Sequence, residues 1–238
     1  IDSILVGDSL GNVMLGLGDT VSVTMEDMIH HGAAVARGAK NALVVVDMPF
    51  MSYQSSVHDA VVNAGRLMKE ARANAVKLEG GVEVADRIRA IVDCQIPVCA
   101  HIGLTPQGIN ALGGFKVQGK TADSARKLLE DAHAVEEAGA FAVVLEAIPA
   151  ELAERVSAEL TIPPIGIGAG AGCDGQVLVN QDMLGMFHDF TPKFVRRFAE
   201  VGDVMLEAYR AYDAAVKDGS FPAAEHTYAA PAGVLENL

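Results

Sequence analysis

Five short apolar runs of this chain each carry, at or near their ends, residues that can do chemistry. The runs and their polar residues are ILVGDS (4–9) with Asp8 and Ser9, ALVVVDMPF (42–50) with Asp47, AVKLEGG (75–81) with Lys77 and Glu79, VCAHIG (98–103) with His101, and AVVLEAI (142–148) with Glu146. Parallel strands of an α/β protein deliver their carboxyl ends to the same face. We therefore expect these side chains to share one site.

Three carboxylates of this set, those of Asp8, Asp47 and Glu79, predict a metal site. Hard oxygen ligands suit Mg²⁺, which takes few protein carboxylates and keeps waters that a substrate can replace. Zinc fits less well, because no Cys or paired His stands nearby in these runs. The alternative for each single Asp is a cap on the helix that follows it.

Lys77 and Glu79 are two residues apart on one expected strand, so their side chains point to the same side. Lys77 could then meet a substrate carboxylate while Glu79 faces the metal, or the two could simply pair with each other inside the barrel. Ser9 follows Asp8 where a strand turns into a loop, and its N–H and hydroxyl could hold a ligand oxygen.

Glu146 ends its strand without a basic neighbour and is our candidate general base. A carboxylate that removes the proton α to a metal-chelated carbonyl makes an enolate, and the metal stabilises the developing oxyanion. His101, taken alone, is more typical of a partly buried structural histidine than of a catalytic one.

Segments with helical periodicity alternate with the apolar runs, and the alternation predicts a parallel sheet with right-handed crossovers. The helical segments are 25–39, 57–73, 82–94, 122–140 and 150–160. Thr24 and Thr121 precede two of them as candidate N-caps, and Gly139 ends the segment that follows Thr121 as a candidate C′ glycine.

Two more strands are expected at 163–169 and 176–181, which makes about seven βα repeats. We therefore predict an α/β fold, a (β/α)8 TIM barrel whose first strand and helix are missing from this chain. We expect a single domain over 1–238, with a C-terminal helix at about 193–217 and a tail after it. An open doubly wound sheet is the alternative.

The composition bounds the class of protein and its partners. The chain has 238 residues, of which 50% are hydrophobic and 5% aromatic, which suits one domain with an aliphatic core. A formal net charge of −13 argues against a nucleic-acid partner. Three cysteines give no disulfide framework, and we find neither a signal peptide nor a membrane-spanning run, so we expect a cytoplasmic protein.

The chain also resembles a known family, the ketopantoate hydroxymethyltransferases, in motifs that occur in the same order. The motifs are VGDSLGNVMLG, VVVDMPFMSY, AVKLEGG, AHIGLTPQ, GGFKVQGK, AVVLEAIPAELA, IGIGAGAGCDGQVLV and FPAAEH. The resemblance runs from Ile4 to about Tyr228, and the motifs are highly specific together.

The resemblance implies a (β/α)8 barrel that binds Mg²⁺ and acts in pantothenate biosynthesis. The implied reaction transfers a one-carbon unit from 5,10-methylenetetrahydrofolate to 3-methyl-2-oxobutanoate, giving 2-dehydropantoate. By resemblance, Asp8, Asp47 and Glu79 hold the metal, and Glu146 accepts the proton. The substrate-binding positions implied in the same way are Asp8, Ser9, Asp47, Lys77 and His101.

The resemblance further implies a cytoplasmic homo-oligomer, commonly a decamer. Members of the family begin with a strand carrying a T-A-Y-D-like motif and then a helix, which this chain lacks. Two rival functions are considered. A Mg²⁺-enolate lyase or mutase of the phosphoenolpyruvate mutase and isocitrate lyase group would act without folate, and a non-catalytic barrel would have no affinity for Mg²⁺.

Overall fold

The computed structural model describes residues 1–237, and its centre is a parallel sheet of seven strands. The strands are β1 (Ser3–Val6), β2 (Leu43–Asp47), β3 (Ala75–Glu79), β4 (Val98–Gly103), β5 (Ala142–Glu146), β6 (Pro164–Ile167) and β7 (Gly175–Gln176). Each strand pairs with the next one along the chain. This order, with helices between the strands, is that of a (β/α) barrel and confirms the predicted fold class.

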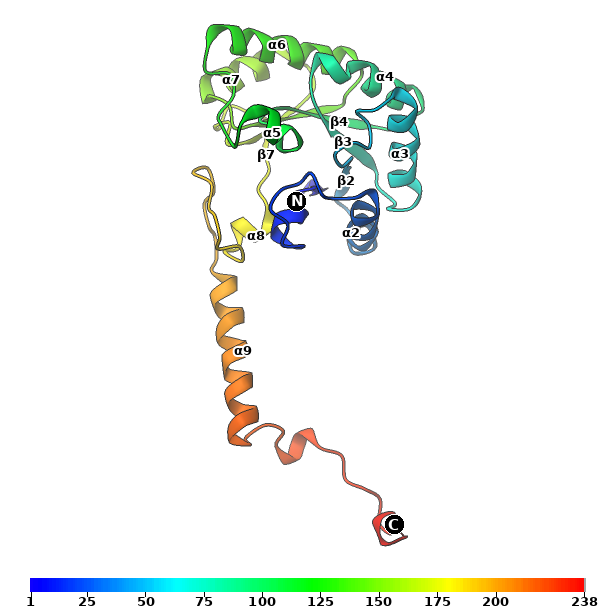
Figure 1. Ribbon diagram of the computed structural model, residues 1–238, viewed down its shortest axis with the longest axis vertical. Coiled ribbons are helices and arrows are strands. Elements are labelled where there is room, and N and C mark those ends of the chain that lie inside the picture. The colour runs from blue at the N-terminus through cyan, green and yellow to red at the C-terminus, as the bar shows by residue number, and fades with distance from the viewer. Residues whose placement is uncertain (238) are drawn as a thin grey trace. The chain divides into compact units, whose positions relative to one another are not determined.

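Helices follow the strands and cover the outer face of the sheet (Figure 1). The longer ones are α2 (Met25–Gly38), α3 (Val57–Lys69), α4 (Ala85–Asp93), α6 (Ala122–Glu137) and α7 (Ala150–Glu159). Short helical turns lie in the connections: α1 (Leu10–Val13), η1 (Val82–Val84), η2 (Pro106–Gly108) and α5 (Ile109–Leu112). The five predicted helical segments therefore all contain a helix.

Threonines start two of these helices, as the sequence predicts. The Thr24 hydroxyl accepts a hydrogen bond from Asp27 N–H at 3.1 Å, and the Asp27 carboxylate accepts one from Thr24 N–H at 2.9 Å. Thr121 and Ser124 form the same reciprocal pair before α6. Such capping boxes satisfy N–H groups of the first turn that no helical carbonyl can reach. Gly139, with φ +99°, follows the other end of α6.

Alternate strand residues divide the sheet into an outer and an inner face. The outer face packs under the helices, and its strand residues include Val44, Val46, Val76, Leu78, Ala100, Val143 and Leu145. The inner face carries a smaller apolar cluster built on Val45, Ala75, Cys99, Ala142, Val144 and Ile167. Because both faces are apolar, the strands read as continuous hydrophobic runs.

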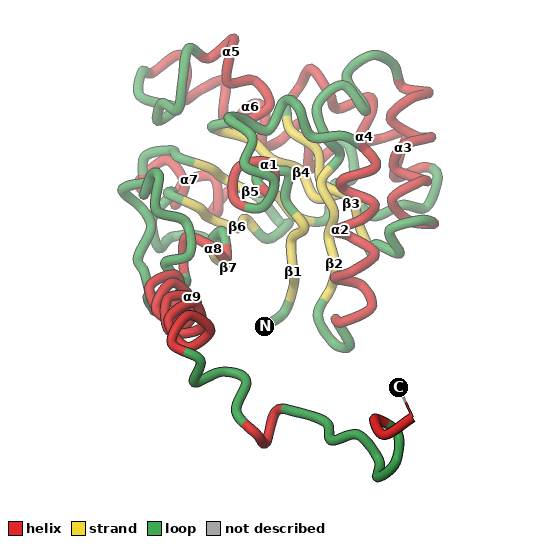
Figure 2. The backbone as a smooth tube through the Cα atoms, turned by 60° about the horizontal axis from the view of Figure 1, so that its bottom comes forward, coloured by secondary structure: helices red, strands yellow, loops and turns green. Residues whose placement is uncertain are grey.

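The sheet curls but stays open within the described residues (Figure 2). No pairing joins β7 to β1 in residues 1–237, and each of these strands has one neighbour. Seven strands in barrel order match the number of repeats that the sequence predicts. The doubly wound alternative is wrong, because its strand order would not follow the chain.

The strand predicted at 176–181 is much shorter than expected. Only Gly175 and Gln176 pair with β6, and the chain turns into the helix α8 (Asn180–Met183). Val177 and Leu178 still pack against the inner apolar cluster. Val177 N–H still donates to Gly166 O of β6 at 3.0 Å, and the hydrophobic character of both residues reflects their partial burial beyond the paired strand.

The helix predicted at about 193–217 begins later, as α9 (Val201–Asp218). Backbone N–H groups just before and at its start donate to carbonyls at the end of α8 and directly after it: Phe198 to Met183 at 2.8 Å and Val201 to Leu184 at 2.9 Å. These long-range hydrogen bonds hold the segment before α9 in an irregular conformation, which the side-chain periodicity does not reveal.

The described chain falls into two compact units, Ile1–Val179 and the segment from Asn180 onward. The first unit contains the whole sheet. The second contains α8 and α9 and the short turns η3 (Ala224–His226) and η4 (Leu235–Asn237). The single domain over 1–238 stays a prediction. Among the described helices, none combines the length and apolar character needed to cross a membrane.

Candidate active site

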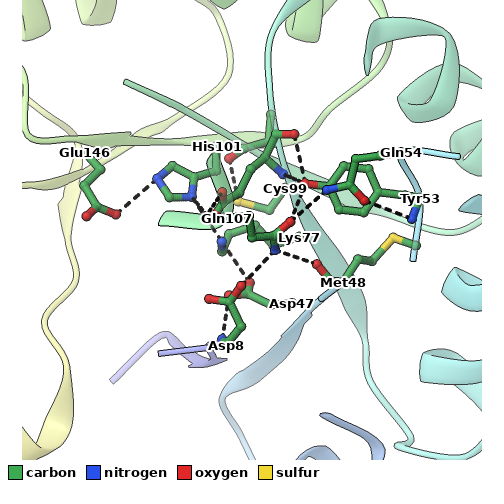
Figure 3. A network of polar contacts seen from close by, with 12 residues as sticks. Asp8, Asp47, Met48, Tyr53, Gln54, Lys77, Cys99, His101, Gln107 and Glu146 are labelled. Atoms are coloured by element: carbon green, nitrogen blue, oxygen red, sulfur yellow. Dashed lines mark hydrogen bonds and ion pairs between the residues drawn. The ribbon is translucent and has the colours of Figure 1, made fainter. Parts of the chain in front are cut away.

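The inner face of the sheet changes from apolar to charged along the strand direction. Above the apolar cluster lie Asp47 at the end of β2, Lys77 and Glu79 on β3, and His101 on β4, all buried. Asp8, in the loop after β1, is buried beside them. Figure 3 shows the side chains of Asp8, Asp47, Lys77 and His101 converging with Glu146 on one site. The structure thus brings together the residues that the strand ends predict.

Strand register explains which side chains become neighbours. Asp47 pairs in register with Lys77, and Glu79 pairs with His101. Lys77 Nζ lies 2.9 Å from Asp47 Oδ1 in a buried ion pair. Asp8 N–H donates to the other Asp47 oxygen at 3.0 Å. The alternative pairing of Lys77 with Glu79 is therefore not what the structure shows, since the partner of Lys77 is Asp47.

His101 lies between two carboxylates. Its Nδ1 is 3.5 Å from Glu79 Oε1, and its Nε2 is 3.2 Å from Glu146 Oε2. Lys77 Nζ is also 3.2 Å from Nδ1. The Glu146 side chain is 16% exposed, against 4% for His101. Glu146 is thus held from the buried side while part of it remains open to a substrate.

The electrostatics of the site reflect crowded, buried carboxylates. Burial, and then the charges of Asp47 and Glu79, raise the pKa of Asp8 to about 8, although Lys77 lowers it. Burial also raises the pKa of Asp47 against the opposing effect of Lys77. A positive ion placed among these groups would relieve their repulsion.

Opposing effects act on the pKa of His101. Burial and the charge of Lys77 lower its pKa, but its contacts with Glu146 and Glu79 outweigh them and raise it to about 9. A protonated imidazole placed between two carboxylates can donate to both. His101 is therefore part of the charged site and not an isolated structural histidine.

Two residues of the network, Tyr53 and Gln107, are not among the residues predicted from the sequence. Both are buried in loops, Tyr53 after β2 and Gln107 after β4. Tyr53 OH donates to Gln107 Oε1 at 2.8 Å, and Gln107 Nε2 donates to Asp8 Oδ2 at 2.8 Å. The signal that could have found them is position, since each closes a motif that follows a strand, VVVDMPFMSY and AHIGLTPQ.

Ser9 lies next to the network and is half-buried. Its hydroxyl takes part in no hydrogen bond with a described residue, and it precedes the short helix α1 without capping it. A Cβ atom on Gly7 would come within 3.2 Å of Ser9 Oγ and 3.5 Å of Asp47 Oδ2. The missing side chain at Gly7 therefore leaves room for both polar groups.

The carboxylates fit a hard cation, although they do not form a closed cage. Within residues 1–237, no three His, Cys, Asp or Glu side chains are grouped closely enough to hold a metal ion as they stand. Mg²⁺ does not need such a cage, because one or two carboxylates with waters and substrate oxygens are enough. Burial and the neighbouring carboxylates raise the pKa of Asp8, and such an ion would favour its charged form.

Similar solved structures share the fold. Phosphonopyruvate hydrolase superposes with a TM-score of 0.55 at 15% sequence identity, covering 98% of this chain and 81% of that one. A putative lyase/mutase from Burkholderia cenocepacia J2315 gives a TM-score of 0.53 at 17% identity, covering 100% of this chain and 82% of that one. At this identity the likeness concerns the fold alone.

Close relatives in sequence are named 3-methyl-2-oxobutanoate hydroxymethyltransferase. The protein of Clostridium novyi (strain NT) is 65% identical over the whole chain, which covers 86% of that relative. The protein of Enterococcus faecalis (strain ATCC 700802 / V583) is 66% identical with the same coverage. The family model described as ketopantoate hydroxymethyltransferase matches residues 1–224. The chain belongs to the ketopantoate hydroxymethyltransferase family.

Proposed function

We propose that this protein transfers a hydroxymethyl group from 5,10-methylenetetrahydrofolate to 3-methyl-2-oxobutanoate, giving 2-dehydropantoate in pantothenate biosynthesis. The family assignment supports this reaction. In the overall chemistry, a carbon–carbon bond forms between C3 of the keto acid and the methylene carbon, and water completes the release of tetrahydrofolate. The residues of the inner face are suited to the first half of this reaction, the removal of the C3 proton.

One observation carries the proposal: a partly open carboxylate, Glu146, lies across His101 from a group of buried carboxylates with one lysine. An acid that must lose a carbon-bound proton needs a base on one side and stabilisation of the developing negative charge on the other. The inner face offers both within one connected network (Figure 3).

The charge-stabilising side includes a cation site. We propose that Asp8, Asp47 and Glu79 hold Mg²⁺. When bound there, Mg²⁺ would act as a Lewis acid toward the keto acid's oxygens. Glu79 Oε1 is buried and its contact with His101 Nδ1 is long, at 3.5 Å, so this oxygen keeps a lone pair to offer a ligand.

We assign the binding of the substrate carboxylate to Lys77 and Ser9. Lys77 Nζ is buried at the centre of the site and carries the positive charge that a substrate carboxylate would meet. The uncommitted Ser9 hydroxyl can hydrogen-bond the same substrate. Asp47 would orient Lys77 through their 2.9 Å ion pair. His101 completes the substrate-binding set by facing Glu146, the group nearest to the reacting carbon in this proposal.

The proton step is assigned to Glu146. Its carboxylate takes the C3 proton, and His101 Nε2, at 3.2 Å, holds the carboxylate in place. The enolate that results attacks the folate-borne methylene carbon. Because proton removal needs no folate, this half of the reaction can be measured on its own.

Exchange of the C3 proton into deuterated water tests the assignment. With Mg²⁺ and 3-methyl-2-oxobutanoate, but without folate, the wild-type protein is expected to exchange this proton, followed by NMR. Glu146→Gln should slow exchange by about 10²–10⁴-fold, the usual contribution of a general base. The control Glu151→Gln, on the exposed first turn of α7, should exchange at the wild-type rate. Full exchange in Glu146→Gln would show that another group is the base.

Assembly and location are proposed on the resemblance alone. We propose a homo-oligomer, a decamer as is common in the family, in the cytoplasm. Sedimentation equilibrium of the purified protein tests the assembly: the mass should be about ten times the chain mass of 24.9 kDa, and a monomer would contradict it.

A further inference from the structure

Gln107 forms hydrogen bonds with residues at the ends of several strands of the candidate site. It lies in η2, directly after the loop that follows β4, and is buried. Its backbone N–H donates to Glu79 Oε2 at 3.0 Å. Its side chain donates to Asp8 Oδ2 at 2.8 Å and to Met48 O at 2.9 Å. One residue therefore ties together the ends of the first three strands from the loop of the fourth.

The orientation of the Gln107 amide is fixed by its partners. Met48 O can only accept, so the NH₂ group must face it, and the other amide proton then points at Asp8. The carbonyl Oε1 accepts from Tyr53 OH at 2.8 Å and from Gln54 Nε2 at 3.0 Å. All hydrogen-bonding positions of the amide are filled, and a flipped amide would place its oxygen against the Met48 carbonyl and the Asp8 carboxylate.

Tyr53 is the second support. Its hydroxyl accepts from Glu79 N–H at 3.0 Å and has one proton for two acceptors, Glu79 O at 3.0 Å and Gln107 Oε1 at 2.8 Å. The shorter contact is to Gln107. Tyr53 therefore braces both the backbone of Glu79 and the amide that holds Asp8.

The two oxygens of each carboxylate, Asp8 and Glu79, therefore have different surroundings. Gln107 occupies Oδ2 of Asp8 and Oε2 of Glu79. Neither Gln107 hydrogen bond uses the second oxygen of its carboxylate, Asp8 Oδ1 or Glu79 Oε1, and the contact found at Glu79 Oε1 is His101 Nδ1 at 3.5 Å. Each carboxylate is thus anchored by one oxygen and presents the other.

We propose that Gln107 is a positioning residue that sets the carboxylates of Asp8 and Glu79 for cation binding, with Tyr53 fixing its amide. The inference rests on the proposed function, because it takes these carboxylates as the Mg²⁺ site. Gln107 does not touch the ion or substrate in this account. Its loss should weaken Mg²⁺ binding and leave the chemical step intact once the ion is bound.

The test measures Mg²⁺ binding directly by isothermal titration calorimetry on metal-free protein. Gln107→Met keeps the length of the side chain and removes the amide donors to Asp8 and Met48, while the backbone N–H that donates to Glu79 remains. We expect its Mg²⁺ dissociation constant to rise by about 10–100-fold, as for other residues that support metal ligands. Its kcat at saturating Mg²⁺ should remain near the wild-type value. The matched control Gln95→Met, exposed before the start of β4, should bind Mg²⁺ like the wild type.

Tyr53→Phe provides a second variant if Gln107→Met does not fold, as judged by circular dichroism. It leaves the amide present, with Gln54 as the remaining donor to its oxygen, and should raise the Mg²⁺ dissociation constant by a smaller factor. An unchanged dissociation constant in a folded Gln107→Met, or in Tyr53→Phe where that variant carries the test, overturns the inference. Absence of Mg²⁺ binding by the wild-type protein would instead overturn the proposed metal site itself, so the two failures are distinguishable.

Discussion

Replacing one charged residue of this site should lower the stability of the fold, and the Lys77–Asp47 pair shows why. Both side chains are about 4% exposed, and their charged atoms lie 2.9 Å apart. Lys77→Met would leave Asp47 buried without its cation, which typically costs about 3–5 kcal/mol. We expect metal-free Lys77→Met to unfold at a correspondingly lower urea concentration.

The double variant Lys77→Met/Asp47→Asn separates this effect from lost packing. It removes the orphaned charge, so much of the lost stability should return. Lys77→Met with the stability of the wild type would contradict the account of the pair as a coupled buried unit.

Residue types at strand ends were enough to predict most of the site. The residues Asp8, Asp47, Lys77, Glu79, His101 and Glu146 could be found because parallel strands bring their ends to one face. Which of them would pair depended on strand register, which a single sequence does not fix. Tyr53 and Gln107 were missed because neither bears a charge, and their role depends on loop conformation.

Among the secondary-structure elements, the pairing of β4 with β5 determines the position of Glu146. Gly103 allows the two strands to approach closely enough to pair. Gly103 has φ +95°, and a Cβ atom there would collide with the Glu146 carbonyl oxygen. Gly103→Ala combines this clash with a backbone conformation that costs about 1–3 kcal/mol for other residues. We expect lower stability in urea and slower C3-proton exchange, because Glu146 must shift.

Gly65→Ala is the matched control. Gly65 lies inside α3, and an added Cβ atom there has no heavy atom within 4 Å. It should stabilise the protein by about 0.4–1 kcal/mol. Equal stability in urea and equal rates of C3-proton exchange in Gly103→Ala and Gly65→Ala would mean that the β4–β5 contact does not constrain Glu146.

Glu136 binds the connection from α7 to β6, and this contact predicts that the stability of the fold depends on pH. Glu136, at the end of α6, accepts hydrogen bonds from Thr161 N–H at 2.6 Å and Ile162 N–H at 3.1 Å. Burial alone would raise the pKa of Glu136, but these amides lower it overall. Its stabilising contribution is therefore complete above its ordinary pKa of 4.5 and is lost as the pH falls through the lower value of the folded state.

Glu136→Gln tests this contribution. At pH 7 the variant should be less stable than the wild type by about 1–3 kcal/mol, the usual value for hydrogen bonds to a charged group. The difference should shrink well below pH 4.5. Glu137→Gln changes the exposed neighbour, whose hydrogen bond with Arg89 uses the backbone carbonyl and not the side chain, and should show no difference at either pH. A gap between Glu136→Gln and the wild type that is the same at both pH values would be inconsistent with an ionised Glu136 cap.

The elements that the sequence predicted poorly are those held by few neighbours. The central strands, with a partner on each side and helices above, were found because burial makes them uniformly apolar. β7 has one described neighbour, and apolar letters at Val177 and Leu178 could not show where pairing stops. The start of α9 was placed too early because backbone hydrogen bonds to Met183 and Leu184, at the end of α8 and directly after it, decide it, and not periodicity.

For the whole molecule, the crowded carboxylates predict that Mg²⁺ stabilises the fold. A ligand that binds only the folded state adds about 2.7 kcal/mol at a concentration of 100 times its dissociation constant. Thermal unfolding should therefore shift upward with added MgCl₂ and not with NaCl at equal ionic strength. Asp47→Asn should lose most of this shift. A shift of equal size in both proteins would place the ion elsewhere.

The central claim is hydroxymethyl transfer, and a turnover assay tests it most directly. Purified protein is incubated with 3-methyl-2-oxobutanoate, with and without 5,10-methylenetetrahydrofolate and Mg²⁺, and 2-dehydropantoate is quantified by mass spectrometry. The account predicts product only when both the folate donor and Mg²⁺ are present, and almost none with Glu146→Gln. Turnover of the keto acid without folate, or no product under the complete conditions, would contradict it.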